Sequence, residues 1–362
     1  PRVLVVIQLS GGNDGLNTVI PYPDPLYAKR RPSLAVGRGE VLRIDDSIGL
    51  HPALRGAAEL VESNRLAVVQ GVGYPQPNRS HFESMDIWHT ARREPEARAT
   101  GWLGRAGDAG AASPPAIYYG GGVQPLALAA AERHAASLPS LESLREGARR
   151  GEWSELAEQL AAEPRPEAGE LLRFIQETER TARRAQARLA EVEARGKGAA
   201  EYPATELAGR LRGVARLIDA LPETPVYYVT HDGFDTHSNQ AAAHTGLLTE
   251  LGDALAAFLA DLEATGHAER TAVLVFSEFG RRVQENASRG TDHGAAAPVF
   301  VAGGAVRGGV YGAHPALDDL DDGDLKHHTD FRRVYATLLD RWLGIASAPL
   351  LGDAFDPLDL FA

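Results

Sequence analysis

The stretch Val3-Leu-Val-Val-Ile-Gln-Leu9, followed at once by Ser10-Gly-Gly-Asn-Asp14-Gly-Leu-Asn17, decides the fold class of this chain. A short, almost wholly apolar run without strict alternation is typical of a strand that is covered on both sides. The glycines after it allow the backbone to turn sharply. A buried strand that ends in a polar turn favours a parallel sheet, in which ligands bind beyond the carboxyl ends of the strands.

Four more runs have the same character and are predicted to be buried strands. They are Leu66–Val72, Val226–Thr230, Ala272–Phe276 and Val299–Ala302. Helical periodicity lies between the strands, as at Leu247–Thr265 and Asp330–Leu343. Strands that alternate with helices predict a single α/β domain over 1–362, with a doubly wound, mostly parallel sheet flanked by helices.

The segment 137–221 differs from the rest because it is rich in Ala, Glu, Arg and Leu and contains no strand candidate. We interpret it as a helical insertion within the domain, packed on the sheet or capping the site. Pro164, Pro166 and Pro203 interrupt the pattern and argue against a coiled coil.

The composition excludes several classes of site and partner. The chain has no cysteine, so it has no disulfide, thiolate ligand or thiol nucleophile. A bound metal must therefore be held by carboxylates, imidazoles or hydroxyls, which suit zinc, manganese, magnesium or calcium. The formal charge of −12 argues against nucleic acid as a partner. No run approaches the roughly 18 apolar residues that a membrane helix requires.

Polar residues follow or precede almost every predicted strand. Asp14 comes just beyond the first strand, where a carboxylate can bind a cation; the alternative is an ordinary Gly-Asn-Asp turn. Between positions 230 and 239, Asp235 and His237 are candidate metal ligands, and His231 is the alternative to His237. A simple polar loop is the other interpretation, but two aspartates and two histidines within seven positions favour a metal.

The segment after the second predicted strand combines a helix start with polar and charged groups. Ser80 and Glu83 have the spacing of a capping box, so a helix is predicted to begin here. The N-terminus of a helix also favours a bound anion, and Arg79 and His81 would add charge and hydrogen bonds. We therefore predict that Arg79, Ser80 and His81 act on a substrate, with a simple helix cap as the alternative.

Two further segments complete the candidate site. Glu278 follows a predicted strand and is a candidate metal ligand, with a helix cap or an ion pair with Arg282 as alternatives; Arg281 is predicted to bind an anion. Asp292 and His293 lie between glycines just before the last predicted strand and are candidate metal ligands. We expect six of these candidates to converge within one cleft at the carboxyl edge of the sheet: Asp14, Ser80, Asp235, His237, Glu278 and His293. Like-charged carboxylates in one cleft would require a cation or altered protonation.

Together these motifs resemble the DUF1501 proteins, an uncharacterised bacterial family, over nearly the whole chain. The resemblance is carried by Ser-Gly-Gly-Asn-Asp14-Gly-Leu-Asn, Arg-Ser80-His-Phe, Phe-Asp235-Thr-His237, Ser-Glu278-Phe-Gly-Arg-Arg and Gly-Thr-Asp292-His293-Gly. The family is similar to alkaline phosphatases, sulfatases and cofactor-independent phosphoglycerate mutases. This likeness implies an alkaline phosphatase-like fold, one or two divalent metal ions, and a nucleophile at Ser80.

The same resemblance implies export. Many DUF1501 proteins carry a twin-arginine signal, and this chain begins at a strand without an initiating Met. We therefore predict that an upstream signal has been removed and that the protein is periplasmic or extracellular; a trimmed chain is the alternative.

Two functional hypotheses follow. The first is a metal-dependent hydrolase of phosphate or sulfate esters, whose substrate is a small-molecule or polysaccharide ester and in which His81 or His293 transfers protons. The second is an exported binding or scaffold protein with a degenerate site. It is motivated by two departures from the superfamily pattern: Ser277-Glu278 replaces Asp-His, and Asp235-x-His237 replaces Asp-x-x-x-His.

Overall fold

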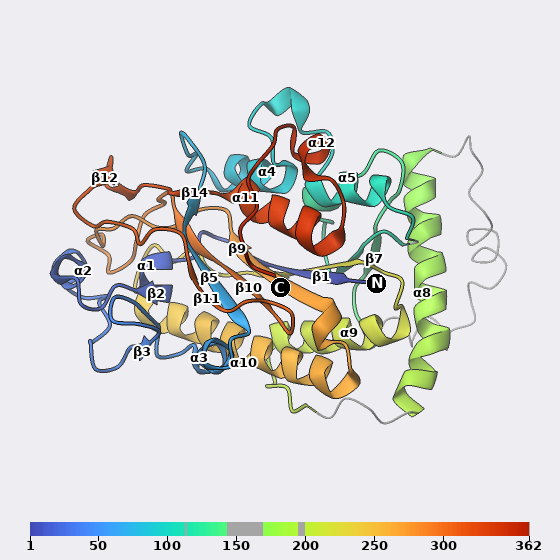
Figure 1. Cartoon of the computed structure of the whole chain (residues 1–362), viewed down its shortest axis with the longest axis horizontal. Helices are drawn as coiled ribbons and strands as arrows, with labels where there is room; N and C mark the ends of the chain where they lie inside the picture. The colour runs from blue at the N-terminus through green and yellow to red at the C-terminus, as the bar shows by residue number, and fades with distance from the viewer. Residues whose placement is uncertain (113, 143–168, 195–199, 362) are drawn as a thin grey trace.

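The computed structural model describes residues 1–112, 114–142, 169–194 and 200–361 (Figure 1). Within these residues, one nine-stranded sheet has the order β11-β5-β10-β9-β1-β8-β6-β7, with β14 also paired to β5. Its strands are β1 Val3–Leu9, β5 Leu66–Gly73, β6 Ile117–Tyr119, β7 Ala136–Leu138, β8 Val226–His231, β9 Thr271–Ser277, β10 Ala297–Gly303, β11 Gly309–Tyr311 and β14 Thr329–Asp330. The five predicted strands are confirmed as β1, β5, β8, β9 and β10. The other four span two or three residues each, too few to show a pattern in the sequence.

The sheet is mixed but mostly parallel. The central strand β1 pairs in parallel with β8 on one side and β9 on the other. β10 is the exception, because it runs antiparallel to both β9 and β5. The predicted doubly wound α/β fold is therefore confirmed, and the reversal of β10 places its first residues beside the carboxyl end of β9.

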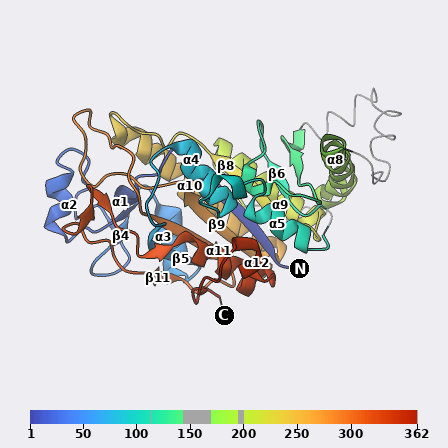
Figure 2. The same ribbon diagram turned by 90° about the horizontal axis from the view of Figure 1, so that it is seen from above.

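Helices cover both faces of the sheet (Figure 1 and Figure 2). One face carries α3 Arg55–Glu62, α9 Glu206–Ala220 and α10 Gln240–Thr265. The other carries α4 His81–Thr90, α5 Trp102–Ala109, α11 Phe331–Ala336 with its π-helical continuation η4 Thr337–Leu343, and α12 Ser347–Leu351. The predicted helices at 247–265 and 330–343 correspond to the larger part of α10 and to α11 with η4.

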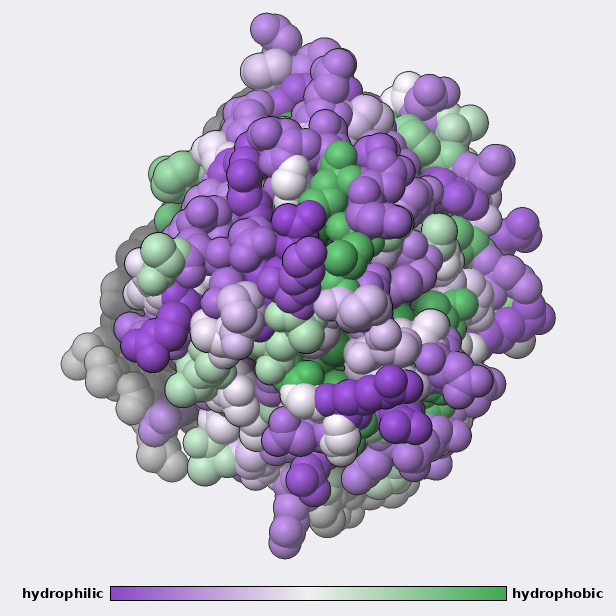
Figure 3. All heavy atoms as spheres, turned by 90° about the vertical axis from the view of Figure 1, so that its left-hand side faces the viewer, coloured by the Kyte–Doolittle hydropathy of each residue, from purple (hydrophilic) through white to green (hydrophobic). Residues whose placement is uncertain are grey.

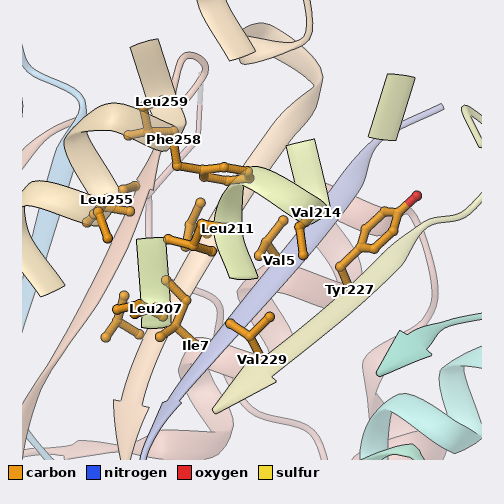
Figure 4. Close-up of a cluster of buried hydrophobic side chains, with 14 of the residues drawn as sticks. Val5, Ile7, Leu207, Leu211, Val214, Tyr227, Val229, Leu255, Phe258 and Leu259 are labelled. Carbon is orange, nitrogen blue, oxygen red and sulfur yellow. The ribbon is translucent and has the colours of Figure 1, made fainter. Parts of the chain in front are cut away.

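The side chains of β1 explain why its sequence lacks alternation. Val5 and Ile7 point into the core beneath α9 and α10, where they meet Leu211 and Phe258 (Figure 4). Leu4 and Val6 point into the opposite core, beneath α4 and α11. Each fully buried side chain of this size contributes about 1.5–3 kcal/mol of hydrophobic free energy.

The segment predicted as a helical insertion is only partly described. Residues 143–168 and 195–199 lie outside the described residues. Residues 137 and 138, predicted without a strand, belong to β7, which pairs with β6 at the edge of the sheet. Beyond them, α8 Glu170–Ala194 packs against β7 and α9, and α9 lies in the helical layer on the sheet rather than over the candidate site.

The remaining elements surround the ends of the strands. A three-stranded sheet has the order β2-β4-β3, and β12 pairs with β13. Their bounds, with the short helices, are α1 Gly15–Thr18, β2 Val19–Ile20, α2 Pro25–Arg30, β3 Leu42–Arg43, β4 Gly49–Leu50, η1 Pro95–Ala97, η2 Leu126–Leu128, η3 Ala268–Arg270, β12 Leu320–Asp321 and β13 Asp324–Leu325. No described helix is both long and apolar enough to cross a membrane.

The carboxyl ends of the parallel strands point to the left in Figure 1, toward α1 and β12. Seen from that side, the surface is mostly hydrophilic, with apolar atoms in a recessed band near its middle (Figure 3). The candidate residues of the sequence lie on this side, because β1, β8 and β9 all end here and β10 begins here.

Candidate metal centre

One oxygen of Asp235 is surrounded by three imidazoles. Its Oδ1 atom lies 3.0 Å from Nε2 of His237, 3.3 Å from Nε2 of His81 and 3.3 Å from Nε2 of His293. The four residues come from the loop after β8, the first turn of α4 and the loop before β10. The fold therefore joins segments that are more than 200 positions apart in the sequence.

Two of these rings are oriented by strong acceptors at their other nitrogen. Nδ1 of His81 lies 2.8 Å from Oε1 of Glu278, and Nδ1 of His293 lies 2.7 Å from the backbone oxygen of Arg79. An oxygen of either kind accepts a hydrogen bond, so both rings donate from Nδ1. Their Nε2 lone pairs are then directed at the common centre. Acceptors that hydrogen-bond to Nδ1 orient metal-binding histidines in the same way.

The third ring has an equivalent neighbour. Nδ1 of His237 lies 3.4 Å from Oδ1 of Asp292, a carboxylate that also accepts a hydrogen bond from Asn286. Nε2 of His237 lies 2.9 Å from Nε2 of His293.

The donor set fits a divalent cation. His81, Asp235 and His293 each offer a ligand atom, and these atoms lie within 4.8 Å of one another. Nε2 of His81 is buried and has no hydrogen-bond partner. An unpartnered imidazole nitrogen, beside two others and a carboxylate, is a donor set typical of zinc and similar transition metals. His81, Asp235 and His293 could therefore hold a divalent cation.

The charge of Asp235 is maintained by Arg281. Burial would raise the pKa of Asp235, but a 2.7 Å hydrogen bond from Arg281 and the charge of its guanidinium lower that pKa to about 2. The hydrogen bond to Glu278 raises the pKa of His81, whereas burial lowers the pKa of His293. Asp235 is therefore a full anion at neutral pH, surrounded by rings of unequal basicity.

Arg281 was predicted to bind an anion, but its guanidinium is used within the protein. Its side chain is fully buried. It donates to the backbone oxygens of Gly12 at 2.6 Å, Thr291 at 2.8 Å and Phe234 at 3.1 Å, as well as to Asp235. Since its donors are used in this way, Arg281 fastens three loops of the site together and holds the charge of Asp235.

Ser80 precedes α4, but the predicted capping box does not form. The Ser80 side chain makes no capping hydrogen bond and is exposed. Glu83 instead forms an ion pair with Arg98 at 2.7 Å. The hydroxyl of Ser80 is therefore not committed to the helix, next to the ring of His81.

Arg79 also differs from its predicted role. Its guanidinium pairs with Asp324 at 2.6 Å and Asp322 at 3.1 Å, on the β12–β13 hairpin. It is the backbone oxygen of Arg79, rather than its charge, that serves the site by orienting His293. A polar side chain singled out in a sequence can thus act through its backbone, which its residue type does not reveal.

Asp14 does not join the metal-binding group. It is completely buried, and Arg31 donates to both of its oxygens at 2.6 and 3.0 Å, while Gln240 donates to one of them. Burial would raise the pKa of Asp14, but the charge of Arg31 lowers it to about 2. The carboxylate that the resemblance implied as a ligand is neutralised by an arginine that the sequence analysis did not single out.

Glu278 and Asp292 lie behind the histidines rather than among the ligand atoms. Glu278 is buried, accepts from the backbone N–H of Gly11 and from Ser277, and contacts His81 rather than Arg282. Burial would raise its pKa, but the hydrogen bond with His81 lowers it. Both acids are therefore placed to orient imidazoles. His231, the alternative to His237, bonds instead to the backbone oxygen of Leu247.

A cavity of about 760 Å³ adjoins the group and is lined in part by His81, Asp235 and Glu278. Gln8 and His89 also line it, and they form a buried network that the sequence analysis missed. Oε1 of Gln8 lies 2.8 Å from Nε2 of His89 and accepts a 2.6 Å hydrogen bond from Tyr228. Gln8 and Tyr228 lie inside apolar strand runs, so only the polar groups within those runs could have indicated a site.

The comparisons with known proteins give a family and distant likenesses in solved structures. No curated protein matches this chain. The structure is similar to a phosphonate monoester hydrolase from Silicibacter pomeroyi, at 12% identity and a TM-score of 0.43, covering 99% of this chain and 78% of that one. It is also similar to a sulfatase from Pseudoalteromonas sp., at 14% identity and a TM-score of 0.44, covering 99% and 70%.

A third likeness is to a mutant of the TAB5 alkaline phosphatase, at 9% identity and a TM-score of 0.38, covering 86% of this chain and 94% of that one. The family model described as "Protein of unknown function (DUF1501)" matches residues 1–351, and this chain belongs to that family.

Proposed function

We propose that this protein is a metal-dependent hydrolase of phosphate or sulfate esters. The observation that carries the proposal is the convergence of three Nε2 atoms on one oxygen of Asp235, with each ring oriented from behind through Nδ1. Rings held in this way lose little conformational freedom when a cation binds. Such preorganisation is typical of a built metal site rather than of an incidental polar cluster.

His81, His293 and Asp235 would hold the cation, with His237 beside it. The imidazoles of this group favour zinc over the manganese, magnesium or calcium that the sequence also allowed, because those three ions prefer oxygen ligands. A metal held by these residues would supply Lewis-acid chemistry, polarising an ester oxygen and lowering the pKa of water. We assign His81 and His293 to this group rather than to the proton transfer that the sequence analysis gave them.

Ser80 is the candidate nucleophile. Its hydroxyl is exposed, makes no capping bond and adjoins His81 in the chain. Neither Arg79 nor Arg281 is free to bind the ester oxyanion, since both are paired with aspartates. Charge complementarity toward the ester would therefore come from the metal and from the N-terminus of α4, where backbone N–H groups are unpaired.

The test is a screen of aryl phosphates and aryl sulfates with zinc, manganese, magnesium or calcium, alongside metal analysis of the purified protein. We expect turnover in the parent protein and none in His293→Gln, which should also bind less metal. His328→Gln is the matched control, because that exposed ring lies outside the group.

Two outcomes would contradict the hydrolase. If metal binds but no ester is turned over with any cation, the binding or scaffold alternative is supported. If no metal binds, the site itself is refuted. Export to the periplasm or the extracellular space stays a prediction of the sequence, and locating the full-length protein in fractionated cells tests it.

A further inference from the structure

Part of the cavity beside the candidate metal centre is lined by residues that are not candidate metal ligands. Besides the residues it shares with the centre, it is lined by two aspartates, Asp86 on α4 and Asp232 after β8. Asp232 is exposed and Asp86 is half-buried. Both carboxylates are accessible to a molecule in the cavity.

Positive charge balances these carboxylates only in part. Burial raises the pKa of Asp86 and the charge of Arg98 lowers it, but the Arg98 guanidinium is itself paired with Glu83 at 2.7 Å. Among the described residues that line the cavity, Arg210 is the one lysine or arginine. Its guanidinium already donates to the carboxylate of Glu206 and to the Oγ1 atom of Thr230. Burial lowers the pKa of His89, at the floor of the cavity, to about 4, so this ring is neutral near pH 7. The field in the cavity, away from the metal, is therefore negative.

The rim of the cavity is apolar. It includes Phe82 and Val123, whose exposed fractions of 86% and 92% are the highest among the large hydrophobic residues that the structure describes. Tyr118, Met85 and Leu126 lie along the same walls. Exposed apolar side chains gathered around one cavity mark a binding site rather than incidental surface. Aromatic rings together with carboxylates are the groups that recognise alkylammonium ions.

We infer that this cavity receives the alcohol part of the ester and selects an alcohol that carries an alkylammonium group. An uncharged alcohol of the same shape should bind less well, and an anionic one least well. The inference rests on the proposed function, because the cavity and the metal centre share His81 and Asp235. Partly exposed ion pairs and a cation–π contact together correspond to a preference of about tenfold.

The kinetic test compares two esters that differ in charge but hardly in shape. They are 4-(trimethylammonio)phenyl and 4-tert-butylphenyl phosphate, or the sulfates if those are turned over. The quantity measured is the ratio of their kcat/KM values in the parent and in the double variant Asp86→Asn, Asp232→Asn. Intrinsic reactivity cancels, because the same two esters are compared in both proteins.

We expect the ratio to fall about tenfold in the double variant, because the lost carboxylates contact the ammonium ester more strongly than the tert-butyl ester. Asp46→Asn is the matched control, since this exposed aspartate does not line the cavity. An unchanged ratio in the double variant would overturn the inference while leaving the hydrolase intact.

A binding test separates the inference from the hydrolase. Calorimetric titration of the purified full chain with benzyltrimethylammonium needs no turnover. We expect binding in the parent and in Asp46→Asn, and binding about tenfold weaker in the double variant and in Phe82→Ala. Binding without turnover of any ester would refute the hydrolase and support the cation pocket. Equal binding by parent and double variant, or none by the parent, would refute the pocket.

Discussion

Nε2 of His237 lies 2.9 Å from Nε2 of His293, and both rings are held from behind at their Nδ1 atoms. Two imidazole nitrogens at this distance oppose their lone pairs unless a proton or a cation lies between them. The pair therefore has a built-in preference for a cation, and this preference has consequences for stability.

Metal should stabilise the folded protein. Because the ligands come together only in the native state, a cation at about a hundredfold its Kd should add about 2.7 kcal/mol to the free energy of unfolding. Thermal melts with zinc or manganese, and with a chelator, measure the effect. His293→Gln should melt at the same temperature in both conditions, whereas His328→Gln should respond like the parent. If the chelator leaves the melting temperature of the parent protein unchanged, the proposed metal site is contradicted.

Glu278 should govern metal affinity through His81. Glu278→Met is similar in length but removes the acceptor for Nδ1 of His81, so we expect metal affinity to fall by about 10–100-fold. Glu278→Gln retains an acceptor oxygen, so its metal affinity should fall by a smaller factor. Glu83→Gln is the control, because Glu83 lies on the same helix as His81 but pairs with Arg98. Competition with a chromogenic chelator gives the three affinities. If all three variants bind metal as tightly as the parent, Glu278 does not position His81 for metal binding.

Asp14 should matter for stability rather than for metal. In Asp14→Asn the buried charge of Arg31 loses its counterion, which should cost about 3–5 kcal/mol of unfolding free energy. Asp46→Asn, on the surface, should change it by no more than about 0.5 kcal/mol. Urea unfolding measures both, and metal affinity of the folded Asp14→Asn protein should match that of the parent. Loss of metal at unchanged stability would restore Asp14 as a ligand.

Ser80 should matter for turnover rather than for the helix. Since its side chain makes no capping bond, Ser80→Ala should change the unfolding free energy by less than about 0.5 kcal/mol while abolishing turnover. Thr205→Ala is the contrasting control, because Thr205 caps α9 with its side chain and should cost about 1 kcal/mol. If Ser80→Ala keeps full activity, the nucleophile lies elsewhere.

Two buried histidines should make the protein sensitive to acid. Burial lowers the pKa values of His89 and His244 to about 4, below the ordinary value of 6.5. Between these pH values the unfolded chain binds a proton that the native protein does not, so the unfolding free energy falls as the pH is lowered. The slope is up to about 1.4 kcal/mol per pH unit for each histidine.

Urea unfolding of metal-free protein between pH 7.5 and 4.5 measures this slope. His89→Gln should show a shallower decline than the parent, whereas His328→Gln, altered at an exposed ring, should follow the parent. Equal slopes for the parent and His89→Gln would show that His89 is not held neutral in the native state.

The sequence by itself determined the layered α/β fold and the edge of the sheet that carries the site. Runs such as Val3–Leu9 need cover on both faces, and polar residues at the ends of parallel strands must share one edge. Asp235, in the loop after β8, was singled out in this way. His293 was singled out as a metal ligand expected to share one cleft with Asp235, and His81 as a catalytic group.

Only the tertiary structure decided which candidates meet. His293 precedes its strand, and it lies at the same edge as Asp235 because β10 is antiparallel, a direction that its apolar residues do not encode. Asp14 and Asp235 both follow strands, but their surroundings differ. Asp14 is fully buried in an ion pair with Arg31, whereas Asp235 pairs with Arg281 and still faces three imidazoles. The physical reason is that the partner of a charged group is set by packing between distant segments, whereas a local sequence pattern encodes only burial and backbone geometry.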